Sequence, residues 1–354
     1  MASEKSSNVS SSAVVEQAAK AAPDWHGSWL VNLLAKPEAM TVVLLILAFI
    51  VGALLSPYFL HVTFLLDHTS TYIEIGIMGL GLVFVIISGE IDLSVEATLA
   101  LVACVAGVLY FDAGIPMPIV IVVCLLLGAG LGWLNGTLVT RMKLPSLAVT
   151  LATLALYRGV ANILVGDDSR PKLAWSRDIV FPSWFLGIDK IMVPGTPIPL
   201  PLVILIVLAI ILGIILHKTT LGRWVYATGT NVQAARYSGI PTDRVKTLVF
   251  TLSGFLSGLA GLIMVSRLTV ARYDHASGWV LDTITAVVLG GIAITGGVGS
   301  VLGAVLAFLL IVVLRTGMGV ANVKAESQLT VIGALLIVAI LASNLSARLR
   351  RRGN

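Results

Sequence analysis

Long apolar runs restrict this chain more than any other feature of its sequence. Several of them approach or exceed about 18 residues, the length with which an α-helix crosses about 30 Å of hydrocarbon. Because lipid offers the backbone no hydrogen-bonding partner, such runs must form helices or closed barrels, and the alternating pattern of a barrel strand is absent. The sequence therefore predicts an all-α fold, a polytopic transmembrane helical bundle.

The composition excludes an ordinary soluble domain. Charged residues make up 12% of the chain and the mean hydropathy is +1.00, whereas about 25% of a soluble domain is charged. The net charge of +5 indicates no nucleic-acid binding, because the basic residues gather beside the predicted spans. Cys104 and Cys124 lie inside apolar runs, which predicts core packing and neither a disulfide nor a metal site.

The apolar runs divide the chain into one membrane domain and two polar tails. Residues 39–345 form the predicted transmembrane domain, between a cytoplasmic N-terminal tail, residues 1–38, and a basic cytoplasmic tail, residues 346–354. Residues 25–34 place apolar side chains on one helical face, so an interfacial helix and a plain linker both remain open there. About ten spans are predicted, at residues 39–56, 69–88, 94–111, 117–138, 147–165, 199–217, 247–269, 283–296, 299–318 and 329–345.

Lysines and arginines indicate how the spans are oriented. Most of the 23 basic residues fall near the termini, between the fourth and fifth predicted spans, and in residues 218–246. In the long loop 166–198, aspartates offset the basic side chains. Cytoplasmic loops carry the excess of Lys and Arg, so both termini and residues 218–246 are predicted to be cytoplasmic, in agreement with an even number of spans.

Two short glycine-containing stretches interrupt the helical pattern between apolar segments. They contain Gly89, Glu90 and Asp92 in the first stretch, and Gly290, Gly291, Gly296 and Gly297 in the second. Irregular backbone at membrane depth must be buried in protein or face water, and paired interruptions are typical of transporters built from repeats. We predict two broken or re-entrant segments.

Ionisable side chains inside the predicted spans indicate either structural ion pairs or a substrate path. Glu74 lies in the second span and Arg158 in the fifth, and such groups usually face a bundle interior or a pathway. A pair between Arg158 and a carboxylate such as Glu74 is the structural interpretation. Alternatively, Glu74, Arg158, Trp279 and Asp282 line a translocation path.

Three acids, Glu90, Asp92 and Glu96, lie within one short stretch. Closely spaced carboxylates can perform acid–base chemistry or bind a metal. Because a helix begins near Leu93, however, Asp92 or Ser94 is expected to cap it, and Glu96 to favour its positive N-terminal end. We favour this capping interpretation.

Residues 218–246 form a polar, basic segment between long apolar runs. Residues 233–239 predict a short helix, with Asn231 or the threonine before it as the N-terminal cap. Gly239 suits the left-handed position that ends a helix, and Pro241 prevents its continuation. A short capped helix in a cytosolic loop is suited to docking onto another protein; an ordinary solvated loop is the alternative.

The sequence contains no catalytic signature. No Gly-Lys dipeptide occurs, so a Walker A phosphate loop is absent, and the five histidines lack metal-ligand spacing. We predict no catalytic residue, no metal and no cofactor. If ATP drives transport through this chain, the ATPase is a separate chain.

Several spaced motifs in one order carry a family resemblance over about residues 40–345. They are SGEIDLSV at 88–95, NG at 135–136, LATL at 151–154, LGR at 221–223, YATGTN at 226–231, AAR at 234–236, SGI at 238–240 and AVVLGG at 286–291. With these motifs the chain resembles the membrane permease subunits of bacterial ATP-binding-cassette sugar importers of the ribose, xylose and arabinose class.

The resemblance implies that the cytoplasmic segment carries a coupling helix, which docks on the ATPase subunit. The general importer pattern there is Glu-Ala-Ala followed by Gly after three residues. Gln233 stands in place of the acid, which argues against a salt bridge from this position but not against docking. The residues expected to couple to the ATPase are Asn231, Gln233, Ala234, Ala235, Arg236 and Gly239.

The resemblance also implies a multi-pass protein of the bacterial inner membrane and the partners of an importer. These are an ATPase subunit, a second permease copy or paralogue, a periplasmic or extracellular sugar-binding protein and the lipid bilayer. Alternating access would move a monosaccharide or similar small polyol, with GEID at 89–92 and LYRG at 156–159 favouring rhamnose or autoinducer-2. The alternative is an ion-coupled secondary sugar transporter that uses a buried carboxylate. The broken segments and buried charges argue against a non-transporting scaffold.

Overall fold

The computed structural model describes residues 37–56, 59–172 and 180–352 of the 354-residue chain. The predicted interfacial helix at residues 25–34 lies outside them. Regular structure in the described residues is helical, apart from two isolated β-bridges, Arg170 with Ala271 and Met192 with Pro199. The all-α prediction is therefore confirmed for this part of the chain.

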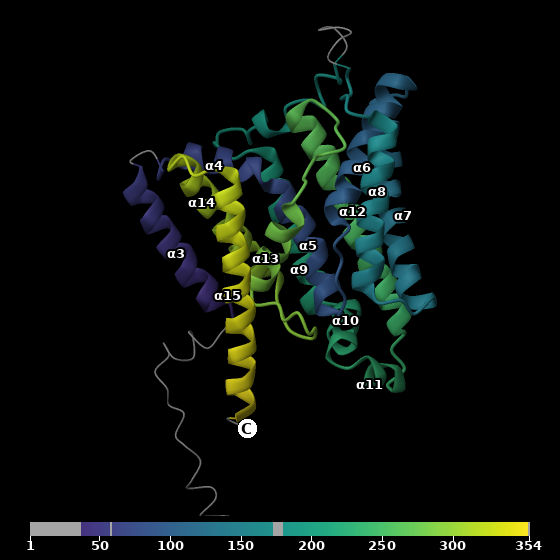
Figure 1. Ribbon diagram of the computed structural model, residues 1–354, viewed down its shortest axis with the longest axis vertical. Coiled ribbons are helices and arrows are strands. Elements are labelled where there is room, and N and C mark those ends of the chain that lie inside the picture. Colours follow the sequence, from purple (N-terminus) through teal and green to yellow (C-terminus); the bar gives the residue numbers. More distant parts are fainter. Residues whose placement is uncertain (1–36, 57–58, 173–179, 353–354) are drawn as a thin grey trace, which may run out of the picture.

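The helices of the described residues follow one another along the chain as Figure 1 shows. They are α3 (Pro37–Leu55), α4 (Val62–Thr71), α5 (Ile73–Ile87), α6 (Val95–Gly107), α7 (Met117–Arg141), α8 (Ser146–Val165), α9 (Leu200–Lys218), α10 (Thr220–Thr230), α11 (Val232–Tyr237), α12 (Thr242–Leu268), α13 (Trp279–Leu289), α14 (Val301–Val320) and α15 (Ala325–Arg352). A π-helical turn at Val108–Asp112 extends α6, and Ile188–Lys190 forms a 3₁₀ turn.

The number of spans that the described residues support is smaller than the predicted number. Six helices are long and apolar enough to cross a membrane, or seven if α4 and α5 are one span bent by 59°. Each of the ten predicted segments overlaps a helix, although the one at residues 283–296 runs past the end of α13 into non-helical chain. Helices α3, α13 and α15 contribute only shorter apolar stretches, Met40–Leu54, Trp279–Leu289 and Glu326–Val338. About ten spans therefore remains a prediction, and the bend at Tyr72 is a feature that the sequence did not indicate.

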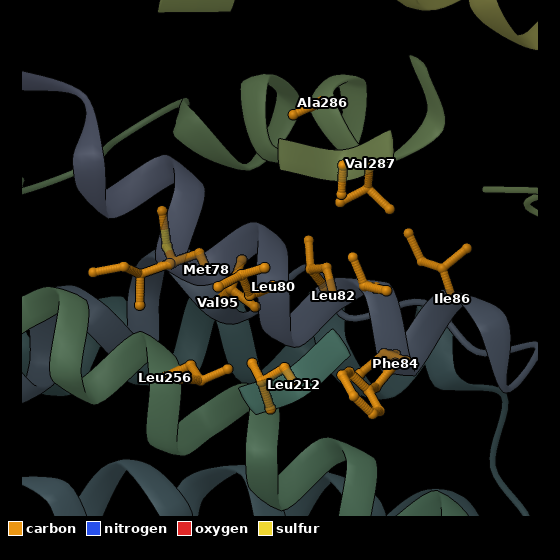
Figure 2. Packing of buried hydrophobic residues seen from close by; sticks show 14 of the residues in the cluster. Met78, Leu80, Leu82, Phe84, Ile86, Val95, Leu212, Leu256, Ala286 and Val287 are labelled. Carbon is orange, nitrogen blue, oxygen red and sulfur yellow. The ribbon is translucent and has the colours of Figure 1, made fainter. Parts of the chain in front are cut away.

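Helix α5 is the centre of the bundle. All of its 15 residues are buried, and it contacts α9, α12, α13 and α14. Figure 2 shows α5 passing between Ala286 and Val287 of α13 on one side and Leu256 and Leu212, from α12 and α9, on the other. A helix that is apolar on every face belongs in an interior, and α5 satisfies this rule.

The helices around α5 expose apolar side chains, as expected of surfaces in contact with lipid. Ile163 on α8 is 85% exposed, and Leu126 on α7 and Ile210 on α9 are exposed as well. A water-soluble domain rarely exposes contiguous apolar surface of this extent. The outer helices thus fit a hydrocarbon environment, while α5 and α12 form the protein interior.

Both glycine-containing stretches predicted as breaks are non-helical. The chain leaves α5 at Ser88 and resumes helical structure at Val95, and it leaves α13 at Gly290 and resumes at Val301. Their depth in a membrane stays a prediction.

Candidate functional site

Residues 218–246 lie at the lower end of the bundle in Figure 1, where α10 and α11 are labelled. Asn231 caps α11, because its Oδ1 atom accepts a hydrogen bond from the Ala234 N–H at 3.0 Å. Gly239 has a φ of +80°, the left-handed conformation expected where this helix ends. The predicted short, capped helix is confirmed.

Most of the predicted coupling residues lie on the surface of this end. Asn231, Gln233, Ala234, Arg236 and Gly239 are exposed, whereas Ala235 is buried and anchors α11. The Arg236 side chain turns back to the first turn of α12, where it pairs with Asp243 and donates to Thr242 Oγ1 at 2.9 Å. The most exposed large side chain on α11 is Tyr237, at 92%, which the sequence analysis did not select. An aromatic residue presented in this way is a typical anchor for a protein partner.

Both non-helical stretches meet the end of α10 at the foot of α5. The Gly297 N–H donates to the Ile87 carbonyl at 2.8 Å, which joins the second stretch to the last residue of α5. Gly229 of α10 fits between them so closely that a Cβ atom there would lie 1.8 Å from Ile87 O and 2.6 Å from Gly297 N. Gly89 and Gly296, both with a φ of +84°, complete the contact. We call Gly89, Gly229, Gly296 and Gly297 the glycine junction.

Side chains strengthen the same connection. The Tyr226 hydroxyl of α10 donates to the Gly299 carbonyl at 2.7 Å, and Lys246 of α12 pairs with Glu90 of the first stretch. Helices α10 and α12 are therefore tied to the two non-helical stretches by both backbone and side-chain contacts.

Asp92 organises the start of α6. Its Oδ1 atom accepts hydrogen bonds from the Ser94 N–H at 3.0 Å and from the Ser94 hydroxyl at 2.7 Å. Its Oδ2 atom accepts from the Ser253 hydroxyl of α12 at 3.0 Å. Asp92 thus bonds Ser94, the residue before α6, and neither side chain caps the first turn of the helix, so the predicted cap by Asp92 or Ser94 is wrong. The described residues contain no group of three His, Cys, Asp or Glu side chains suited to a metal.

Glu96 and Arg158 form an ion pair inside the bundle, 3.2 Å from Oε1 to the guanidinium. Arg158 also donates to the carbonyls of Tyr273 and His275, at 2.6 and 2.8 Å. The Glu96 Oε2 atom accepts from the Val280 N–H at 2.9 Å. Glu96 lies in the first turn of α6, as expected, and it also pairs with Arg158 and bonds the start of α13, a role the sequence did not indicate.

Arg158 pairs with a carboxylate, as the structural interpretation expected, but its partner is Glu96, so Glu74 as the named partner is wrong. Glu74 lies 3.0 Å from Arg267, near the end of α12. The reason is helix packing, because α8 lies against α6 whereas α5 lies against α12.

A third ion pair joins Asp282 of α13 to Arg315 of α14 at 2.5 Å. The Arg315 guanidinium lies 5.6 Å from the centre of the Tyr72 ring, and Tyr72 in turn lies 6.3 Å from the Trp279 ring. The structure thus brings Glu74, Trp279 and Asp282 toward the start of α13, with each carboxylate paired to an arginine.

Sequence reasoning missed these arginines. Arg267 and Arg315 stand within the seventh and ninth predicted spans, and an ionisable residue in a span was itself the signal that would have identified them.

Known proteins of similar sequence are transport permeases. The family model described as branched-chain amino acid transport system / permease component matches residues 64–340. The autoinducer 2 import system permease protein LsrD of Salmonella typhi is 36% identical over 309 residues, which cover 87% of this chain and 92% of that protein. The LsrD proteins of Escherichia coli (strain K12) and Shigella flexneri match with the same identity and coverage. No solved structure matches the chain.

Proposed function

Because the chain belongs to the branched-chain amino acid transport system / permease component family, we propose that it is the membrane-spanning permease subunit of an ATP-driven importer. ATP hydrolysis then belongs to a separate ATPase subunit. The observation that carries this proposal is the glycine junction, through which the exposed α11 is connected by backbone contacts to both non-helical stretches of the bundle.

The surface of α11 is the proposed docking site for the ATPase. Tyr237 presents its ring to solvent, and Ala235 and the Asn231 cap hold the helix in place. Exposed aromatic side chains on a rigid support are frequent anchors of protein interfaces. This surface is the proposed cytoplasmic end, together with both termini, in agreement with the basic residues that surround it.

The proposed mechanism is alternating access. ATP binding moves the partner against α11, and α10 follows because Asn231 alone separates the two helices. The glycine junction passes this movement to the end of α5 and to the non-helical stretch that follows α13. The spans then rock about the buried α5, and the bundle opens alternately at either end.

The proposed substrate is a small polyol. The LsrD relatives are named for autoinducer 2 import, and autoinducer-2 or rhamnose is the favoured cargo. A binding protein would deliver it at the end opposite α11, and a second permease copy or paralogue would complete the assembly in the bacterial inner membrane.

Uptake into vesicles that contain the assembled complex tests this function. Uptake is expected to require ATP on the α11 side and to survive an ionophore. An ion-coupled transporter would instead use a titrating carboxylate such as Glu74, but that group is fully buried and paired with Arg267. Uptake that continues without ATP and collapses with the ionophore would refute the importer.

A further inference from the structure

A cavity of about 400 Å³ opens at the end of the bundle opposite α11. It lies between the last turn of α12, the loop of residues 269–278 and the first residue of α13. Its volume falls in the range of small-molecule sites, about 300–1,000 Å³. The polar and aromatic residues that line it include Thr71, Arg267, Arg272, Asp274, Ser277 and Trp279.

The charged side chains in the cavity wall are already neutralised. Arg267 pairs with Glu74 at 3.0 Å, and Arg272 pairs with Asp274 at 2.7 Å. Each of these guanidinium groups therefore has a carboxylate partner. A zwitterion or an anion would have to compete with these partners. Separating the buried pair of Arg267 and Glu74 is strongly unfavourable, whereas the pair of Arg272 and Asp274 is exposed and contributes little. The wall thus favours an uncharged ligand.

Hydrogen-bonding capacity nevertheless remains at the cavity. The bond to Glu74 uses the Nε–H of Arg267, one of the five N–H donors of a guanidinium. Glu74 and Asp282 lie behind the lining and not in it, and each keeps one buried carboxylate oxygen without a hydrogen-bond partner, Oε2 and Oδ1 respectively. A buried acceptor without a partner is unfavourable by about 1–3 kcal/mol. Ligand hydroxyl groups would satisfy such acceptors.

An aromatic wall links the cavity to these buried acceptors. Trp279 lines the cavity and packs against Tyr72, over which the Arg315 guanidinium lies. Arg315 in turn holds Asp282. Apolar rings beside a few convergent polar groups are the usual composition of a small-molecule site.

We propose that this cavity is the entry subsite for an uncharged, polyhydroxylated substrate of monosaccharide size. Trp279 contacts its apolar face, and the pairs Arg267–Glu74 and Arg272–Asp274 bond its hydroxyl groups. Asp282, further along α13, and Arg315 form the next contacts with the substrate after it leaves this subsite. This inference rests on the proposed importer function and its polyol cargo, and it adds the place where the cargo enters and the residues that contact it there.

Substrate protection of a cysteine placed in the cavity tests the proposal directly. Ser277 is exposed within the cavity lining, and Cys104 and Cys124 are buried, so a Ser277→Cys variant offers one accessible thiol in this region. The variant, in the assembled complex, is treated with a membrane-impermeant maleimide in the presence of autoinducer 2, L-rhamnose or L-leucine. The transported polyol is expected to slow labelling roughly tenfold, a change that corresponds to about 1.4 kcal/mol. Labelling of Thr196→Cys, in an exposed loop outside the cavity, serves as the control.

A second variant separates a ligand contact from a disturbed fold. Trp279→Leu is expected to raise the KM for the polyol roughly tenfold, about 1.4 kcal/mol, with an unchanged ATP requirement. Trp184→Leu, at an exposed tryptophan that does not line the cavity, is expected to leave the KM unchanged.

Two results would overturn the subsite. In the first, a polyol is taken up in an ATP-dependent manner but slows maleimide labelling of Ser277→Cys no more than labelling of Thr196→Cys. The second is uptake of L-leucine in place of both polyols. Because labelling requires no ATP, a failure of the importer function shows in the vesicle assay alone and is distinguished from a failure of the subsite.

Discussion

The Oε2 atom of Glu96 accepts a hydrogen bond from the backbone N–H of Val280 at 2.9 Å. This contact joins the first turn of α6 to the first turn of α13, two short helices that each follow a non-helical segment. Helix N-termini carry partial positive charge, so the Glu96 carboxylate stabilises both, and Arg158 balances it from α8. The Glu96 carboxylate therefore holds the first turns of α6 and α13 together, and Arg158 of α8 balances its charge.

Replacing Glu96 with Gln should destabilise the protein, because Arg158 loses its ionic partner inside the bundle. Breaking a buried ion pair typically lowers the free energy of unfolding by about 3–5 kcal/mol, and we expect about 3 kcal/mol because the Arg158 side chain retains 18% exposure. Chemical denaturation in detergent measures the loss. Glu326→Gln is the matched control, since Glu326 is exposed on α15. Equal stability of the two variants would contradict the structural role of Glu96.

Replacing Gly229 with Ala should disrupt the glycine junction. A Cβ atom at this position would lie 1.8 Å from Ile87 O, a backbone atom that cannot move without displacing α5. Overpacking of this kind destabilises by about 1–3 kcal/mol, and we expect ATP-dependent uptake to be lost. Thermal unfolding and vesicle uptake measure the two effects. Gly159→Ala on α8 has open space around it and should leave both unchanged; full uptake by Gly229→Ala would exclude a role for the junction.

Replacing Gly239 with Val should uncouple ATP hydrolysis from transport. The φ of +80° at Gly239 is unfavourable for a β-branched residue, although no atom stands within 4 Å of the new Cβ. The end of α11 is therefore expected to shift while insertion in the membrane is preserved. Parallel assays of ATPase activity and uptake measure the coupling. Gly239→Asn, which tolerates the left-handed conformation, should retain it, and unchanged uptake by the valine variant would argue against a coupling helix.

Acidification should destabilise the protein through His275, in the loop between α12 and α13. Burial lowers the pKa of His275, and its Nε2 atom lies 2.8 Å from the Val270 carbonyl. The hydrogen bond to Val270 and the charge of Asp274 oppose this lowering of the pKa, whereas Arg272 and Arg267 act in the same direction as burial.

Acid lowers the stability because the fold prefers the neutral form of His275. In the unfolded chain His275 binds a proton below about pH 6.5, whereas in the folded protein it stays neutral to a lower pH. The stability that neutral His275 contributes is therefore fully present above about pH 6.5. It is lost as the pH falls below that value, because protonation then favours the unfolded chain. Thermal unfolding from about pH 7.5 to 5.5 should show the decline, and His275→Gln should make it shallower. Identical slopes for both proteins would exclude His275 as the cause.

Local sequence signals predicted the elements of this protein well. Each predicted span overlaps a helix, and the Asn231 cap and the left-handed Gly239 occur where the residue types indicate. These features depend on neighbours in the chain, on backbone conformational preference and on the need to satisfy backbone hydrogen bonds. The bend at Tyr72 between α4 and α5 has no such local signal, since neither glycine nor proline stands there.

The sequence by itself determined an all-helical membrane permease with a polar, capped helix at one end. Only the tertiary structure decided which charges meet, because Glu96 and Arg158 lie on different helices, as do Glu74 and Arg267. It also decided that Gly229 contacts both non-helical stretches. Ion pairing and close backbone packing are set by which helix faces lie against each other, and this depends on the packing of the whole bundle around α5 rather than on any local run of residues.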